Sequence, residues 1–263
     1  MLRLTFLGTG TSQGVPMIGC DCQVCRSADY HDKRLRSSVM VERLSDEGST
    51  EACIVIDAGP DFRYQMLREG VRSLDAILLT HEHKDHIAGI DDVRAFNYFD
   101  NRAIPIYATE QVAKIVRKDF DYAFTEQKYP GAPEIDLQIV DPEKPFDVAG
   151  FRVTPVSGMH YYLPVTGYRI GNMAYLTDFN HISDEEILKI KNIEVLVVNA
   201  LRHDKHISHF TVGEAIETAK RIGAHHTYLT HMSHQIGLHE EMSSKLPSNV
   251  SYAYDSLVVD IKE

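Results

Sequence analysis

Long apolar segments and cysteines are scarce in this sequence of 263 residues. No apolar run approaches the roughly 20 residues that a membrane-spanning helix needs, so we expect no membrane span. The opening MLRLTFLGTG lacks the basic segment followed by an apolar one that marks a secretory signal, and we therefore predict a cytoplasmic protein. No linker, tandem repeat or low-complexity segment interrupts the chain, which indicates one domain over residues 1–263.

Basic residues are also fewer than acidic residues. The chain has 27 Lys and Arg against 38 Asp and Glu, a formal net charge of −11. Such a surface does not concentrate polyanions, so long nucleic acid is not an expected partner. Bound metal ions would offset part of this charge locally, so a small phosphorylated substrate remains compatible with it. The composition leaves the formation of a homodimer open.

The pattern of apolar residues indicates an α/β protein. A strand is expected in LRLTFLG, and a β-hairpin in RSSVMVERL, SDEGS and EACIVIDAG. Helical spacing predicts helices over DFRYQMLREG and over residues 110–124. Ser183 with Glu186, and Thr211 with Glu214, have the spacing of capping boxes that start two further helices.

One short pattern recurs three times along the chain. DAILLTH, MAYLTD and HTYLTH each consist of a short apolar strand, then Leu-Thr, then a metal-capable residue: His81, Asp178 and His231. In α/β sheets, ligands bind at the carboxyl ends of the strands. We therefore expect these three ends to converge on one crevice.

The segment THEHKDH has the highest density of metal-capable side chains in the sequence. Imidazole and carboxylate suit borderline or hard divalent ions such as zinc or manganese. His81 and His83, two residues apart in an extended turn, are placed to bind one ion. Asp85 and His86, at the onset of the next helix, are placed to face a second one.

Three of the four cysteines lie within six positions, as CxCxxC at Cys20, Cys22 and Cys25. This layout suits a metal better than disulfides, and three thiolates need a fourth ligand to close a tetrahedral zinc site. His234 is the natural candidate, because it follows His231 by three residues. The fourth cysteine, Cys53, lies in an apolar strand and is expected to be a buried small residue.

HEHKDH matches the HxHxDH signature of the metallo-β-lactamase superfamily, which the chain resembles over nearly its whole length. The resemblance implies an αββα sandwich, with two mixed sheets packed face to face and helices outside. It also implies two divalent ions, Zn or Mn, with the following ligands: His81, His83, His160 and Asp178 for the first ion, and Asp85, His86, Asp178 and His231 for the second.

The cysteines narrow the resemblance to the phosphoribosyl cyclic phosphate phosphodiesterase group, in which CxCxxC and a late histidine hold a structural zinc. His209 looks like a histidine of the tRNA 3′-end processing endonucleases that contacts the scissile phosphate and serves as, or assists, the general acid. Asp85 and His209 are thus the predicted catalytic residues. His206 is an alternative acid, and Arg202 is a candidate for binding phosphate.

These observations favour a dinuclear metal-dependent phosphodiesterase that acts on a small, compact phosphodiester, such as phosphoribosyl 1,2-cyclic phosphate. One alternative is an RNA-processing or DNA nuclease of the same fold, although we find no basic, Gly/Pro-rich arm that would grip tRNA. A second alternative is a biosynthetic or carrier protein similar to pyrroloquinoline quinone biosynthesis protein B, which has a similar cysteine motif.

Overall fold

Two mixed sheets form the centre of the protein in the computed structural model, which describes residues 1–262. Each sheet has seven strands among the described residues. The first sheet has the order β14 (Val258–Ile261), β1 (Leu2–Gly8), β2 (Ser38–Leu44), β3 (Thr50–Ile56), β4 (Ala76–Leu78), β5 (Ile104–Ala108), β6 (Ile135–Ile139). The second has the order β13 (Val250–Tyr252), β12 (His226–Thr230), β11 (Val195–Asn199), β10 (Met173–Leu176), β9 (Leu163–Ile170), β8 (Phe151–His160), β7 (Phe146–Val148).

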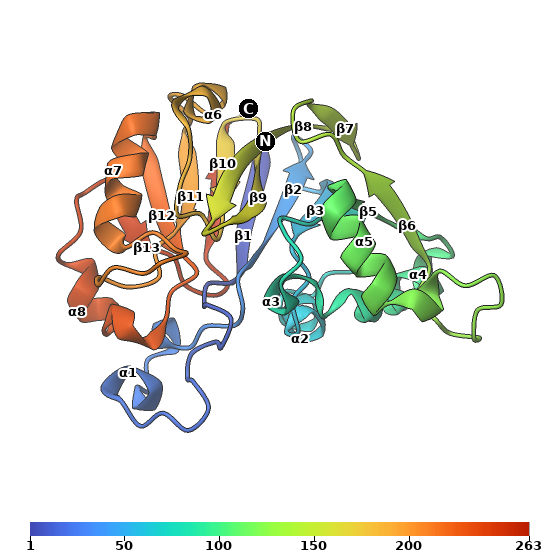
Figure 1. Ribbon diagram of the computed structural model, residues 1–263, viewed down its shortest axis with the longest axis horizontal. Coiled ribbons are helices and arrows are strands. Elements are labelled where there is room, and N and C mark those ends of the chain that lie inside the picture. The colour runs from blue at the N-terminus through green and yellow to red at the C-terminus, as the bar shows by residue number, and fades with distance from the viewer. Residues whose placement is uncertain (263) are drawn as a thin grey trace.

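Helices cover the outer faces of both sheets (Figure 1). The first sheet carries α2 (Phe62–Arg68), α3 (Lys84–Ile87), α4 (Arg94–Asp100) and α5 (Glu110–Asp119), and the second carries α6 (Asp184–Lys189) and α7 (Val212–Ile222). Two short helices, α1 (Gln23–Arg26) and α8 (His239–Ser243), lie at the lower edge in Figure 1, with α1 on a protruding loop. Among the described residues, no helix is both long and apolar enough to cross a bilayer.

The apolar residues of the strands alternate between two environments, because successive side chains of a strand point to opposite faces of its sheet. In β4, Ala76 and Leu78 pack between the sheets, whereas Ile77 points to the helices outside. In β11, Val197 lies in the central layer and Leu196 under the outer helices of the second sheet. The resulting layers confirm the expected αββα sandwich.

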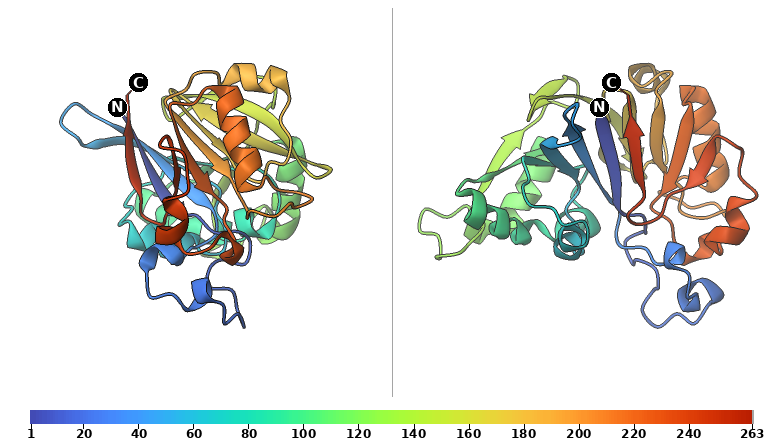
Figure 2. Two further views of the ribbon diagram at one scale, coloured as in Figure 1. Left: turned by 90° about the vertical axis from the view of Figure 1, so that its left-hand side faces the viewer. Right: turned by 180° about the vertical axis from the view of Figure 1, so that it is seen from behind.

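The two ends of the described chain lie side by side (Figure 2), because β14 pairs antiparallel with β1. In the first sheet the neighbouring strands β3, β4, β5 and β6 pair in parallel, and in the second sheet the neighbouring strands β10, β11, β12 and β13 do the same. Parallel strands present their carboxyl ends at one edge, where the metal-capable residues follow.

Several local predictions are confirmed, and two need correction. The hairpin forms as β2 and β3, and the capping box of Thr211 and Glu214 is complete. At Ser183 only half of the box forms, because the Glu186 carboxylate instead accepts from the Ser157 N–H at 2.7 Å. The helix expected over 110–124 ends at Asp119, and a short 3₁₀ turn then carries Ala123 into the core.

Candidate metal centre

The residues expected to bind the two catalytic ions come from strand ends in both sheets. His81, His83, Asp85 and His86 lie on the loop and helix that follow β4, and His160 closes β8. Asp178 follows β10 and His231 follows β12. The structure brings all seven together, so the expected convergence of the three strand ends is confirmed, with one refinement: the strands belong to two facing sheets.

A first group is formed by His81, His83 and His160, whose nearest ring nitrogens lie within 4.8 Å of one another. The Nε2 atom of His81 lies 3.1 Å from Nδ1 of His83. The rings of His83 and His160 are edge-on, with centroids 5.1 Å apart. Three imidazole nitrogens that converge on one point can serve as ligands of a single divalent ion.

A second group is formed by Asp85, His86 and His231. Asp178 lies between the two groups, fully surrounded by protein. Its Oδ2 is 3.2 Å from Nε2 of His86, and its Oδ1 is 3.1 Å from Nε2 of His231. Asp178 also shares a ligand cluster with His81 and another with His160. This carboxylate is therefore the group within reach of both sites.

His86 provides a test of whether a cation fits here. Its buried Nε2 has no hydrogen-bond partner among the described residues, although it lies 3.2 Å from the carboxylates of Asp85 and Asp178. Burial alone would lower the pKa of His86, but Asp85, Asp57 and Asp178 raise it well above its usual value. The side chains thus draw positive charge to this point, and the donor set fits a divalent ion.

Hydrogen bonds on the far side of each ring orient the histidines. Asp57 accepts from Nδ1 of His86 at 2.6 Å, and the Ser208 carbonyl accepts from Nδ1 of His160 at 2.8 Å. The Ser37 hydroxyl lies 3.2 Å from Nδ1 of His231. In all three residues Nε2 is left to face the centre. Such outer partners fix the tautomer and the orientation of a metal-binding ring.

Asp57 is the functional residue that the sequence analysis missed. It directly follows β3, with a left-handed φ of 68°, and Asp178 and His231 follow their own strands with φ of 62° and 56°. Non-glycine residues rarely adopt this conformation, and it clusters at functional sites. ACIVID has the same form as the three recurring segments, an apolar strand ending in a metal-capable residue, except that it lacks Leu-Thr.

His209 lies at the edge of this centre. Its Nδ1 is 3.5 Å from Oδ1 of Asp178 and has no hydrogen-bond partner among the described residues. Burial lowers the pKa of His209 to about 3, so its imidazole is neutral at pH 7 in the protein alone. His206 lies beside it, with ring centroids 5.2 Å apart. Arg202 instead holds its own loop, because it donates to Gln235 Oε1 at 2.7 Å and to two loop carbonyls.

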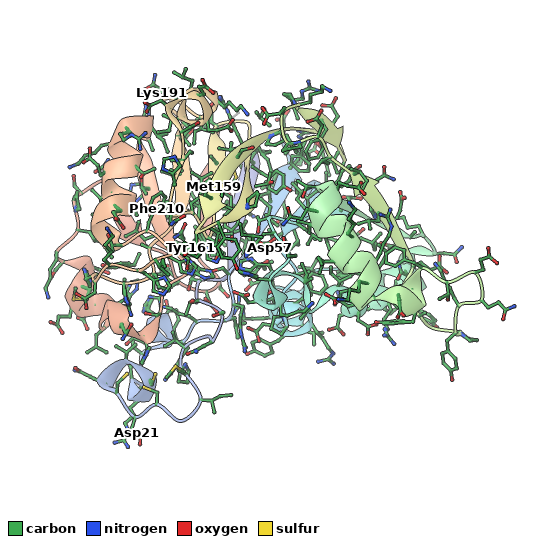
Figure 3. All side chains as sticks on the ribbon, in the orientation of Figure 1. Asp21, Asp57, Met159, Tyr161, Lys191 and Phe210 are labelled. Carbon is green, nitrogen blue, oxygen red and sulfur yellow. The ribbon has the colours of Figure 1, made fainter. Side chains whose placement is uncertain are left out.

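Two cavities flank the centre, on either side of the segment 206–209. One, of about 250 Å³, is mainly polar and includes Thr11, Ser12, His206 and His209. The other, of about 290 Å³, lies between His83 and His160 and the exposed residues Tyr161, Tyr162 and Ile207. Figure 3 shows Tyr161 and Asp57 in the middle of the molecule, far from Asp21 at the tip of the N-terminal loop.

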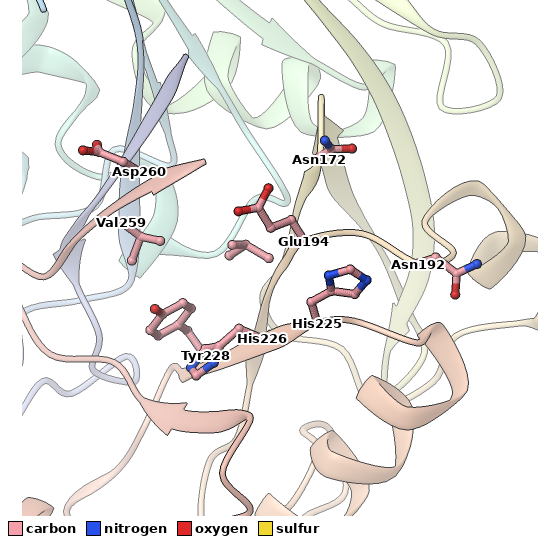
Figure 4. Close-up of a pocket in the computed structure, with 9 residues that line it drawn as sticks. Asn172, Asn192, Glu194, His225, His226, Tyr228, Val259 and Asp260 are labelled. Atoms are coloured by element: carbon pink, nitrogen blue, oxygen red, sulfur yellow. The ribbon is translucent and has the colours of Figure 1, made fainter. Parts of the chain in front are cut away.

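A larger cavity, of about 490 Å³, lies away from the centre (Figure 4). Glu194 and His225, which line it, stand at the amino ends of β11 and β12, whereas the metal-capable residues follow the carboxyl ends. Ligands of α/β sheets bind at the carboxyl ends of strands. We therefore place the candidate active site at the two smaller cavities.

The cysteine motif forms a separate cluster, as expected. The thiols of Cys20 and Cys22 lie 3.2 and 3.3 Å from Nδ1 of His234, and Cys25 completes the group. Cys22 caps the amino end of α1. Burial opposes ionisation of its thiol, but hydrogen bonds from the Cys25 N–H and from His234 lower the pKa of Cys22 to about 6. Cys53 is buried in β3, also as expected.

The architecture and the converging His and Asp ligands define a metallo-β-lactamase fold, and comparisons with known proteins agree. A family model described as beta-lactamase superfamily domain matches residues 53–232. A diphosphatase of the PhnP family is 40% identical, with a TM-score of 0.89 over 98% of this chain and 96% of that one. Zinc-bound PqqB from Methylobacterium extorquens, at 18% identity, has a TM-score of 0.76 over 98% of this chain and 100% of that one. This third similarity supports the fold alone.

A curated relative named octanoyltransferase, from Porphyromonas gingivalis (strain ATCC BAA-308 / W83), is 44% identical over 100% of this chain but only 52% of the relative. The chain thus spans about half the length of that relative. The chain belongs to the metallo-β-lactamase superfamily and, within it, to the PhnP-like group. Its fold and family are those of metal-dependent hydrolases.

Proposed function

We propose that this protein uses two divalent ions to hydrolyse a small phosphodiester or a diphosphate with a substituent at each end. The observation that carries the proposal is the position of Asp178, within ligand distance of both histidine groups. A carboxylate bridge keeps two ions close together. Two ions so placed activate a water and stabilise the attacking and leaving oxygens of an in-line displacement at phosphorus.

The residues that would hold the ions follow from the two groups. His81, His83 and His160 would hold the first ion, and Asp85, His86 and His231 the second, with Asp178 shared. The mixed nitrogen and oxygen donors suit zinc and manganese alike. A third ion, a structural zinc, would be held by Cys20, Cys22, Cys25 and His234.

The proposed substrate class includes both phosphodiesters and disubstituted diphosphates, because the phosphorus atom that is attacked has the same substituents in the two. In a disubstituted diphosphate each phosphorus has two bridging oxygens and one ionised oxygen, as in a phosphodiester. The 40% identical relative is a diphosphatase, and the cysteine motif resembles that of the phosphoribosyl cyclic phosphate phosphodiesterases. The two flanking cavities, of about 250 and 290 Å³, suit a small molecule.

His209 is the proposed partner of the leaving oxygen. With a pKa of about 3 it is neutral at pH 7, and it then donates a hydrogen bond rather than a proton. An anionic phosphate beside His209 favours the protonated form, because opposite charges raise the pKa of a histidine. Its role as general acid stays a prediction, with His206 as the alternative. Asp85, whose carboxylate lies 3.2 Å from Nε2 of His86, would supply negative charge to the site of the second ion.

The alternatives have less support. The name octanoyltransferase belongs to a protein about twice as long, of which this chain covers only 52%, so we do not carry that activity over to this chain. Coenzyme PQQ synthesis protein B of Methylorubrum extorquens (strain PA1) aligns with only 43% of the chain, at 31% identity. A nuclease that binds long RNA or DNA is disfavoured by the net charge of −11.

A substrate panel tests the proposal. Metal-loaded protein would be assayed with zinc or manganese on bis(p-nitrophenyl) phosphate, phosphoribosyl 1,2-cyclic phosphate, a disubstituted diphosphate, an octanoyl thioester and a tRNA precursor. We expect hydrolysis of small phosphodiesters or diphosphates that a chelator abolishes and added metal restores. Turnover of the thioester or the tRNA alone would overturn the proposal.

A further inference from the structure

We propose that the cavity between the first metal group and Tyr162 is a subsite for a planar, nucleoside-like group of the substrate. This inference deepens the proposed function and rests on it, because it names what the phosphate ester carries. The cavity measures about 290 Å³ and is shared by His83 and His160 with Tyr161, Tyr162 and Ile207. A group bound here would be joined directly to a phosphate at the metal centre.

Two aromatic side chains stand exposed at this cavity. Tyr161 is 53% and Tyr162 is 78% exposed, and their rings meet edge to face with centroids 4.9 Å apart. Exposed aromatic side chains beside a site are a common means of binding bases, because every base has a flat face that stacks on an aromatic ring. The two tyrosine rings therefore offer a flat apolar surface on which a planar group of the substrate can stack.

The wall that carries the rings is held in place. Tyr161 has a left-handed φ of 60°, and its N–H donates to Oδ1 of Asn180 at 3.0 Å. Nδ2 of Asn180 donates in turn to the Ile207 carbonyl at 2.8 Å. One amide side chain therefore ties the tyrosine turn to the opposite wall. A preformed wall lowers the ordering cost of binding.

A polar group in the cavity distinguishes a nucleoside from a simple apolar chain. Glu82 lines the same cavity, and its Oε1 accepts from Gln111 at 2.8 Å. Its buried Oε2 has no partner among the described residues. Glu82 thus adds a negatively charged acceptor to the cavity wall, so a ligand with N–H or O–H groups is favoured over a purely apolar one. An acyl chain would cover the tyrosines but offers this carboxylate no hydrogen-bond donor.

Binding to the metal-loaded protein tests the subsite without requiring turnover. Calorimetric titration would compare AMP, ribose 5-phosphate and octyl phosphate, which share a phosphate monoester and differ in the group that it carries. We expect AMP to bind about tenfold more tightly than ribose 5-phosphate, near the low end of the range for one stacked base. Octyl phosphate should show no such advantage.

Variants at Tyr162 test whether its ring causes the tighter binding of AMP. Tyr162→Leu should reduce AMP affinity to that of ribose 5-phosphate, whereas Tyr162→Phe, which keeps a flat ring, should retain the difference. Tyr129→Leu is the matched control, because Tyr129 is 82% exposed on the loop that precedes β6 and does not line this cavity. Glu82→Gln should weaken AMP and leave octyl phosphate unchanged.

Three results would overturn the inference: equal binding of AMP and ribose 5-phosphate, an AMP advantage that survives Tyr162→Leu, or a Tyr162-dependent preference for octyl phosphate. The proposed function is tested separately by the substrate panel. If no phosphodiester or diphosphate of that panel is hydrolysed but AMP binding depends on Tyr162, the subsite stands and the proposed function fails.

Discussion

The two candidate metal sites differ in what holds their ligands together. The His and Asp centre follows the strands of two sheets whose cores are fully packed. The cysteine cluster instead lies on a loop outside the sheets, with only a small apolar cluster around Val15 and Val24. Rigid strand ends place ligands before any ion arrives, whereas a loop with little core depends on its ion for order. We therefore expect damage to the first site to affect chemistry and damage to the second to affect stability.

Asp178→Asn should have the largest effect. An amide supplies neither the charge nor an equal bridge, so the variant should lose metal and nearly all activity while it stays folded. Metal content by mass spectrometry, hydrolysis rates and circular dichroism would check this expectation. Asp147→Asn, at an exposed carboxylate, is the control. A variant at Asp178 with full metal and rate would place the bridge elsewhere.

His209→Ala tests proton donation within the same centre. If His209 donates to the leaving oxygen, the variant should keep its metals and lose about 10²–10⁴-fold in rate on esters with poor leaving groups. An activated aryl phosphodiester, whose leaving group needs no proton, should be affected much less. Equal losses on the two substrates would make His209 a phosphate-binding group, and His206→Ala would be the next variant to test.

Asp57→Asn tests how far the scaffold itself tunes the centre. Asp57 accepts from Nδ1 of His86, while Nε2 of the same ring faces Asp85 and Asp178. Loss of the Asp57 charge should cost about 10–100-fold in activity or metal affinity, as outer partners typically do. Metal titration followed by rate measurement would separate the two effects. An unchanged metal affinity and rate would show that the tautomer of His86 is set without Asp57.

Cys22→Ser should act on stability and only weakly on chemistry. We expect the loss of one zinc per chain and a lower Tm, because binding of a structural zinc contributes to the free energy of folding. Metal analysis and thermal unfolding would measure both, with Cys53→Ala as the variant that keeps its metals. Full zinc content together with an unchanged Tm would contradict the assignment of the cysteine cluster.

The smallest expected effect concerns acid stability near the cysteine loop. Burial, followed by the charges of Arg34 and His31, lowers the pKa of His239 from 6.5 to about 4. The unfolded chain therefore takes up this proton first, so the stability from neutral His239 is complete above about pH 6.5 and is lost as the pH falls towards 4. His239→Gln should show a smaller loss between pH 7.5 and 5 in urea unfolding. An identical pH dependence would exclude this contribution.

Local sequence indicated an α/β protein and several of the residues that meet at the centre, whereas the αββα sandwich followed from the resemblance to the metallo-β-lactamase superfamily. Strand ends with Leu-Thr before a metal-capable residue identify His81, Asp178 and His231, and spacing identifies the rest of the loop to His86. The structure brings these side chains together, because the positions of residues on one loop or at one strand end depend on short-range geometry. The capping box at Ser183 forms only in part, because the Glu186 carboxylate accepts from the N–H of Ser157 in β8 instead of from the backbone of Ser183.

The sequence by itself determined which residues are able to bind metal, because that capacity belongs to the side chains and their local spacing. Tertiary structure alone decided which hydrogen-bond partners orient these metal-capable side chains. Asp57 reaches His86 from another strand, and the Ser208 carbonyl reaches His160 from a loop 48 positions away. Tyr162 lies near the centre because it follows His160 by two residues, but tertiary structure decided what it faces. Asn180 joins the Tyr161 N–H to the Ile207 carbonyl, which brings the segment around Ile207 to the same cavity.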